Sequence, residues 1–158
     1  MAGDRTLIKV LDLRKKSEDE ALKKWSDSQQ QVSVFTSQLE KLQSFRDLYV
    51  QEMQQHQGHN MDMQQYLAYQ GFIDRLDKTY ERQQLMLTKL KEQTAALKDA
   101  YLKSRQDRRI IESLIEKHKQ TALKAEERAE AKFADELVSS KQARILIEHN
   151  LQKLNHGK

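Results

Sequence analysis

The stretch MQQHQGHNMDMQQY, residues 53–66, decides the fold because it separates two long runs of helix-forming residues. Gly58 suits the left-handed residue that follows a helix C-terminus. Asn60 suits an N-cap, which places Asp62 in the first turn of a second helix, where negative charge is favourable. Because a short link joins antiparallel neighbours, residues 58–61 predict a hairpin turn.

The rest of the chain is almost free of residues that interrupt helices. There is no proline in 158 residues, and the four glycines are at positions 3, 58, 71 and 157. An average chain of this length has about eight prolines and about eleven glycines. Since proline and glycine are the strongest interruptions of secondary structure, this chain can run as very long helices.

Apolar residues before the turn recur at alternating steps of four and three. Ten of the fifteen positions reached in this way between Leu7 and His56 are apolar. After the turn, the same stepping from Asp62 to Ile115 reaches eleven apolar residues among sixteen. A heptad seam of this length predicts a left-handed coiled coil.

The seam weakens after Ile115 and resumes one residue out of phase from Phe133 to Leu154, a stutter that unwinds a supercoil locally. We therefore predict an all-α fold, a long two-helix antiparallel coiled-coil hairpin in a single domain, residues 1–158. Helix 1 is expected at about 4–57, the turn at 58–61 and helix 2 at about 62–155. Helix 2 is the longer and overhangs its partner at the C-terminal end.

The off-centre turn also predicts the register of the hairpin. With a turn at 58–61, the numbers of paired residues should add up to 115–122, which sets Leu7 opposite residues 108–115. Helix 2 then extends about 40 residues past its partner. The polar seam residues Glu18 and Arg108 should approach each other near the open end, where polar groups fix register.

Composition excludes several functional classes. There is no cysteine, so there is no disulfide and no thiolate chemistry. No apolar run is long enough to cross a membrane, and residues 1–16 lack the apolar core of a signal peptide, which predicts a cytoplasmic protein. No phosphate-binding loop, metal-ligand set or nucleophile motif is present, so we expect no enzyme activity, no metal and no cofactor.

Charge leaves one alternative open. The pI is about 9.2, which is a cue for nucleic-acid binding. However, 28 basic residues are interspersed with 24 acidic ones, which is typical of a solvated helical surface. The densest basic patch consists of Lys103, Arg105, Arg108 and Arg109, interrupted by Asp107.

Two aromatic residues lie beside the seam rather than in it. Phe45 and Phe72 should lie at nearly the same height on the hairpin, next to the seam residues Tyr49 and Tyr69, and Leu48 lies further out. A wide apolar stripe on a slender hairpin has nothing of its own to pack against, and such stripes mark interaction sites. The alternative is that these rings only wrap the seam.

The segment YLAYQGFIDRLDK, residues 66–78, resembles the hallmark stretch of the FliJ family of flagellar export proteins. That family has an aromatic residue, then Tyr-Gln-x-Phe-Ile and a leucine soon after a hairpin turn. A first helix of about 50 residues and a longer second helix also agree, so the resemblance covers nearly the whole chain.

The resemblance implies a non-catalytic stalk of the flagellar type III export apparatus, similar to the central stalk of rotary ATPases. Family members promote ring assembly and activity of the hexameric export ATPase FliI through the end that carries both chain termini. They also bind the membrane export gate protein FlhA and export chaperones. The implied location is cytoplasmic and peripherally associated with the inner membrane at the flagellar base, without direct membrane insertion.

The family's gate-binding surface carries over onto matching positions of this chain. Phe45 stands where a tyrosine is expected, Thr79 and Gln83 stand where the pattern has Ala and His, and Gly71 replaces a more usual Gln. The implied gate-binding residues are Gln38, Leu42, Phe45, Tyr49, Phe72 and Leu76, and the implied ATPase-binding residues are Arg14, Lys15, Lys16, Arg128, Lys132 and Arg144.

Three rival interpretations remain at the level of the sequence. The first is the equivalent stalk of a virulence type III secretion system, and only the stretch from Tyr69 to Ile73 favours the flagellar system. The second is a generic coiled-coil scaffold or homo-oligomer, which predicts no selective loss of function from one surface patch. The third is a nucleic-acid binder, whose binding would weaken steeply as salt rises.

Overall fold

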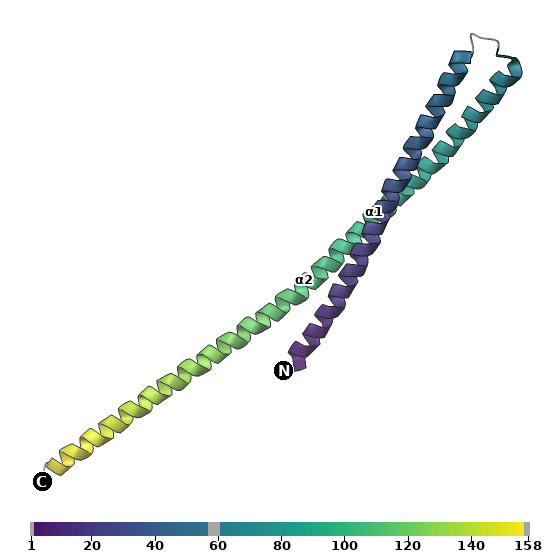
Figure 1. Ribbon diagram of the computed structural model, residues 1–158. Coiled ribbons are helices and arrows are strands. Elements are labelled where there is room, and N and C mark those ends of the chain that lie inside the picture. The colour runs from purple at the N-terminus through teal and green to yellow at the C-terminus, as the bar shows by residue number, and fades with distance from the viewer. Residues whose placement is uncertain (1, 57–60, 157–158) are drawn as a thin grey trace. The chain divides into compact units, whose positions relative to one another are not determined.

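The fold consists of two helices, as the heptad seams predict. The computed structural model describes residues 2–56 and 61–156. Helix α1 spans Ala2–His56, 55 residues, and helix α2 spans Met63–His156, 94 residues (Figure 1). The all-α hairpin with a longer second helix is therefore confirmed, with helix bounds within two residues of those expected.

The start of α2 corrects the sequence-based assignment of its cap. The backbone N–H of Gln65 donates to the Asp62 carboxylate at 2.8 Å, and the N–H of Tyr66 donates to the Asp62 carbonyl at 3.1 Å. Asp62 is thus the N-cap rather than a first-turn residue, because it lies immediately before the first helical residue and its carboxylate reaches the third. Gly58 and Asn60, the residues expected to form the turn, lie outside the described residues.

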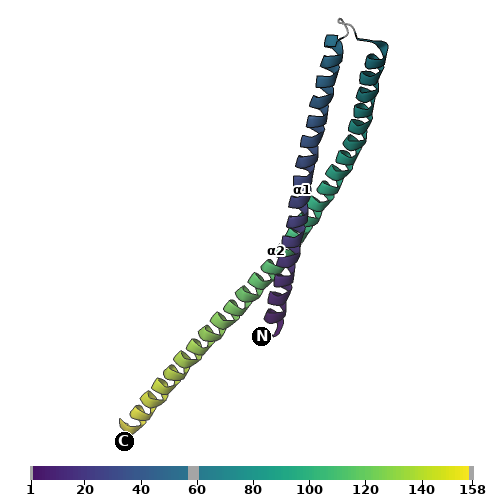
Figure 2. The ribbon, with the colours of Figure 1, turned by 45° about the vertical axis from the view of Figure 1, so that its right-hand side comes forward.

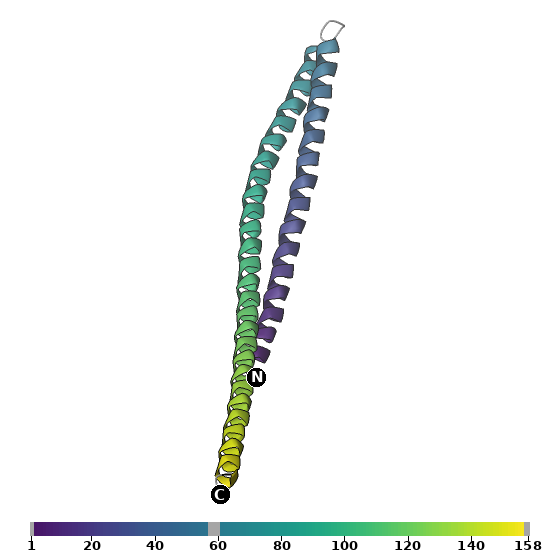
Figure 3. The same cartoon turned by 90° about the vertical axis from the view of Figure 1, so that its left-hand side faces the viewer.

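The chain divides into two compact units. The hairpin unit is Asp12–Arg108, and the terminal unit combines Met1–Leu11 with Arg109–Lys158. Within the hairpin unit α1 and α2 lie side by side and antiparallel, since Arg14 pairs with Asp107 and Arg46 pairs with Asp77 (Figure 2, Figure 3).

The core of the hairpin unit is a single seam between the two helices. Leu39, Ile73 and Leu87 are its buried apolar residues, at 5–8% exposure. The other seam positions from Ala21 to Met53 and from Tyr66 to Arg108 are partly buried, except for the buried Ser28. A two-helix seam has two open sides, so few side chains are enclosed completely, and the expected 4–3 periodicity is the one observed.

Polar residues in the seam are paired across it. The buried Ser28 hydroxyl lies 2.5 Å from Thr94 Oγ1, and Thr94 donates its own proton to the Leu90 carbonyl at 2.7 Å. Ser28 must therefore be the donor to Thr94. Both side chains are short, which suits a close approach of the helices, and the hydrogen bond satisfies polar groups that would be costly to bury alone.

The expected approach of Glu18 and Arg108 is confirmed. Arg108 Nε donates to the Glu18 carboxylate, and both side chains are largely buried, at 21% and 14% exposure. Nearby, Trp25 stacks on Tyr101 with ring centroids 5.4 Å apart. The numbers of both pairs add up to 126, slightly above the predicted range of 115–122, because these long side chains reach along the partner helix instead of straight across it.

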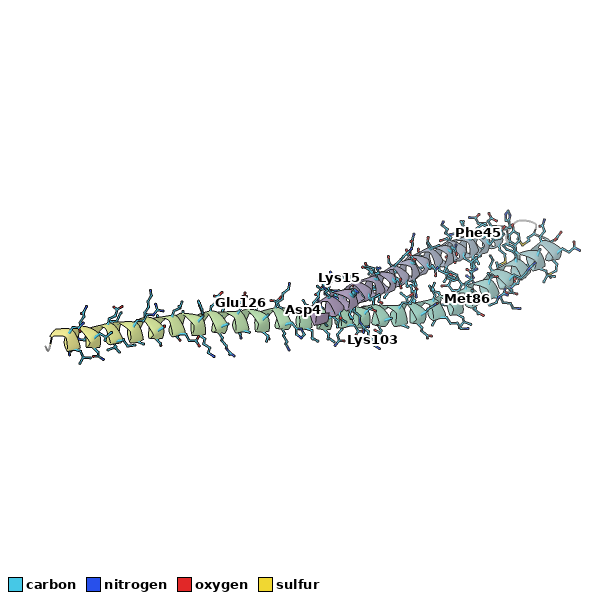
Figure 4. The ribbon with its side chains drawn as sticks, turned by 90° about the horizontal axis from the view of Figure 1, so that it is seen from below. Asp4, Lys15, Phe45, Met86, Lys103 and Glu126 are labelled. Atoms are coloured by element: carbon cyan, nitrogen blue, oxygen red, sulfur yellow. The ribbon has the colours of Figure 1, made fainter. Side chains whose placement is uncertain are left out.

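The terminal unit is paired only over its first turns. His118 Nδ1 lies 3.5 Å from an Asp4 carboxylate oxygen, and Leu7, Val10 and Leu11 are partly buried. Every residue from 116 to 155 is exposed, and Figure 4 shows the side chains around Glu126 projecting from a single helix. The apolar residues of this stretch therefore have no partner within the terminal unit as described.

Candidate protein-binding surface

An aromatic cluster lies across the two helices near the connected end of the hairpin unit. The Tyr49 ring packs against Phe72 with centroids 4.6 Å apart and against Phe45 at 5.1 Å. Tyr69 lies 6.2 Å from Tyr49. These tilted geometries are favourable for aromatic pairs. Phe45 and Phe72 were expected at nearly the same height, but Phe72 packs on Tyr49, whereas Phe45 precedes Tyr49 by one turn of α1 and neighbours the Arg46–Asp77 pair. The two rings therefore meet through Tyr49, offset along the hairpin by about one helical turn.

One side of the aromatic cluster packs within the hairpin, and its other side is exposed to solvent. Tyr49, Phe72 and Tyr69 are partly buried, whereas Phe45 is 47% exposed and Leu48 is 57% exposed. Phe45 thus presents an aromatic surface to solvent while its ring contacts Tyr49. Rigid aromatic side chains with free area are typical anchors of protein interfaces because they lose little conformational entropy on binding.

A bidentate ion pair holds the two helices together beside the cluster. Arg46 Nε donates to Asp77 Oδ1 at 2.5 Å, and Arg46 Nη2 donates to Asp77 Oδ2 at 3.4 Å. This hydrogen bond and the charge of Asp77 raise the pKa of Arg46 above its ordinary value. The pair fixes the register next to Phe45, although its half-exposed position limits its contribution to stability.

A shallow groove of about 420 Å³ continues from the aromatic cluster along the hairpin. It is lined by Gln38, Lys41, Leu42 and Phe45 from α1 and by Gln83 from α2. The structure thus brings together the four predicted gate-binding residues of α1, Gln38, Leu42, Phe45 and Tyr49, with Phe72 of α2. Leu76 is partly buried and follows Phe72 by one helical turn, which keeps it on the same face.

The predicted ATPase-binding residues do not form a comparable cluster. Arg14 faces Asp107 at 3.8 Å, and its neighbours Lys15 and Lys16 are exposed in the hairpin unit. The remaining three, Arg128, Lys132 and Arg144, belong to the terminal unit and are exposed there. Arg14 is therefore partly neutralised, and the other five are solvated cations.

The basic patch that suggested nucleic-acid binding is reduced by pairing. Arg108 is engaged with Glu18, and Asp107 faces Arg14. Arg105 is partly buried, so the exposed cations of this patch are Lys103 in the hairpin unit and Arg109 in the terminal unit. Since affinity for phosphates depends on several free cations acting together, this arrangement disfavours the nucleic-acid interpretation. No cluster suited to a metal ion occurs among the described residues.

Two features of this surface were missed at the level of the sequence. The partner of Arg46 is Asp77, which lies beside the seam and offers no motif of its own. A second and larger groove further along the hairpin is lined by residues outside both seams, including Val34 and Met86. A search for apolar residues at heptad spacing one position away from the seam would have found them.

The amino-acid sequence matches the model of one known protein family. The family model described as Flagellar FliJ protein matches residues 4–145. The chain belongs to the FliJ family. It is therefore a component associated with flagellar protein export, in agreement with the hallmark stretch around Phe72. Searches of curated proteins and of solved structures each gave no match.

Among the residues that the structure describes, no helix of this FliJ-family protein is long and apolar enough to cross a membrane.

Proposed function

We propose that this FliJ-family protein is a non-catalytic stalk that couples the flagellar export ATPase to the export gate. The hairpin unit binds the gate protein FlhA through its aromatic surface. The terminal unit contacts the hexameric ATPase FliI and promotes ring assembly and ATP turnover. Export chaperones are further partners, and the protein acts in the cytoplasm, peripherally associated with the inner membrane at the flagellar base.

The observation that carries the proposal is the exposed, pre-organised aromatic cluster. Tyr49 holds Phe45 and Phe72 at contact distance, and Phe45 keeps nearly half of its surface free. These residues stand at positions that the family resemblance implies for gate binding. A hairpin that needed these rings only for its own stability would bury them, as it buries Leu39 and Ile73.

Substitution of Phe72 tests the gate contact. Phe72→Ala should leave helicity nearly unchanged and weaken binding of the soluble part of FlhA by about tenfold or more, because an interface aromatic is a typical anchor. Leu67→Ala is the matched control, since Leu67 is 59% exposed on the same part of α2 and lines neither of the grooves described for this surface. If Phe72→Ala unfolds the hairpin, Phe72 is a core residue and the surface is misassigned.

Deletion of residues 130–158 tests the ATPase contact. The truncated protein should lose stimulation of ATP hydrolysis by FliI and retain gate binding, because the hairpin unit ends before this segment. In the full chain, reversing the charges of Arg128, Lys132 and Arg144 together should have the same effect. Unchanged stimulation by both variants would place the ATPase contact elsewhere.

A further inference from the structure

A second row of side chains runs along α1 beside the seam. Its positions repeat at alternating steps of four and three, which is the spacing of a coiled-coil seam. Val34 is 51% exposed, Phe45 is 47% exposed and Leu48 is 57% exposed. The complete row is Asp27, Gln31, Val34, Gln38, Lys41, Phe45 and Leu48. The gate-binding residues Gln38 and Phe45 are therefore part of a longer row that continues towards Val34.

The longer row borders a groove between α1 and α2. This groove has a volume of about 790 Å³, and Val34, Phe35, Met86 and Leu90 form its apolar floor and walls. Met86 is 59% exposed, and Figure 4 marks it on α2. Gln38 lines both this groove and the smaller one beside Phe45, so the two form one continuous surface.

The edge of this surface on α2 is basic. Lys89 lines the large groove, and Arg82 and Arg75 precede it by seven and fourteen residues, which keeps them on the same face of a heptad helix. None of the three forms an ion pair with a residue that the structure describes; Arg75 Nε donates instead to the Gly71 carbonyl at 3.3 Å. Three cations at this spacing, each without an acidic partner among the described residues, match a row of carboxylates on a neighbouring helix.

We propose that this surface binds an amphipathic α-helix of the gate protein, with an apolar stripe and an acidic flank along α2. A helix is the occupant because only a helix matches two seam-like rows at heptad spacing, as in a three-helix coiled coil. From Phe72 to Gln93 the surface spans about 30 Å, the length of a helix of about 20 residues. This inference rests on the proposed gate contact. It adds the larger groove to the contact surface, and it specifies that the bound segment of the gate protein is helical and acidic along one side.

Two matched pairs of substitutions test the extended surface with the full chain and the soluble part of FlhA. Met86→Gln should weaken binding about tenfold, whereas Leu85→Gln should not, because Leu85 is 66% exposed but does not line the groove.

Lys89→Glu should weaken binding about threefold to tenfold, whereas Lys91→Glu, two residues away on the other side of the seam, should not.

The outcomes separate this inference from the proposed function. Loss of binding in Phe72→Ala with normal binding in Met86→Gln and Lys89→Glu would overturn the extended surface and leave the gate contact intact. Normal binding in all three variants would overturn both. Tighter binding by Lys89→Glu would show a basic flank and overturn the charge pattern. Self-association of the chain that Met86→Gln abolishes would identify a second copy as the occupant and also overturn the inference.

The secondary structure of the bound segment is tested separately. With isotope-labelled FlhA, the residues perturbed by the full chain should show helical Cα chemical shifts in the complex, and Met86→Gln should reduce their perturbation. Extended chemical shifts in those residues would overturn a helical occupant.

Discussion

Two stretches of α2 both carry apolar residues at heptad spacing, more weakly and one residue out of phase in the second, and they have opposite environments. Between residues 63 and 108, Ile73 and Leu87 are 8% exposed because α1 covers them. Between residues 116 and 155, Leu137 is 50% exposed and Leu151 is 55% exposed, and nothing described in the terminal unit covers them. The spacing of apolar residues thus determines which face of a helix is apolar, whereas burial of that face requires a second helix.

The paired and unpaired stretches of α2 are suited to different roles. The paired stretch holds Phe45, Tyr49 and Phe72 in fixed positions, which suits a surface that binds with little reorganisation. The unpaired stretch cannot stabilise itself by packing, so its order depends on helix propensity and on partners. This is the behaviour expected of a segment that gains order when it enters an assembly.

Hydrogen exchange should show the largest contrast between the two stretches. Amides around Leu39 and Leu87 should exchange at least about a hundredfold more slowly than amides of residues 119–155, because only the former are protected by tertiary packing. Exchange of the isolated protein followed by mass spectrometry measures this. Uniform protection from residue 12 to residue 155 would show that the unpaired stretch is covered, for example by a second copy.

Matched core substitutions should show the next largest contrast. Leu39→Ala removes a residue that is 5% exposed and should lower the free energy of unfolding by about 2–4 kcal/mol. Leu137→Ala removes a residue that is 50% exposed and should change it by less than about 0.5 kcal/mol. Urea unfolding followed by circular dichroism gives both values, and equal losses would contradict the assignment of a single seam.

The Glu18–Arg108 pair should have an intermediate effect. Glu18→Gln keeps the shape but removes the negative charge that Glu18 presents to the largely buried Arg108 guanidinium, which should destabilise the hairpin by about 1–2 kcal/mol. The control is Glu20→Gln, since Glu20 is exposed on the same helix and should be nearly neutral. Equal effects of the two substitutions would mean that net charge, and not this pair, is responsible.

Gly71 offers the smallest and most specific test of the paired stretch. A Cβ at this position would meet no atom within 4 Å, so Gly71→Ala should stabilise α2 by about 0.5–1 kcal/mol. Ala68→Gly on the same helix should destabilise by a similar amount. Weaker FlhA binding by Gly71→Ala would show that the glycine permits close approach of the partner next to Phe72, whereas unchanged binding would make it a tolerated departure from the family pattern.

The fold was predictable because helix and seam depend on local spacing. The absence of proline, the break after His56 and the 4–3 repeat together predicted both helices and the partly buried positions of the seam. The aromatic cluster was predictable for the same reason, since Phe45 and Phe72 deviate visibly from the repeat. The cap of α2 was not predicted correctly, because Asn60 and Asp62 are equally suitable caps by composition.

The sequence by itself thus determined the helices, their antiparallel pairing, the aromatic stripe and the FliJ family. Only the tertiary structure decided which charges are paired, with Asp77 on Arg46 and Glu18 on Arg108. It also showed that Arg75, Arg82 and Lys89 have no acidic partner among residues 2–56 and 61–156. It also revealed the groove between Val34 and Met86. The physical reason is that periodicity along one helix specifies a face, whereas pairing and grooves depend on the axial register between two helices.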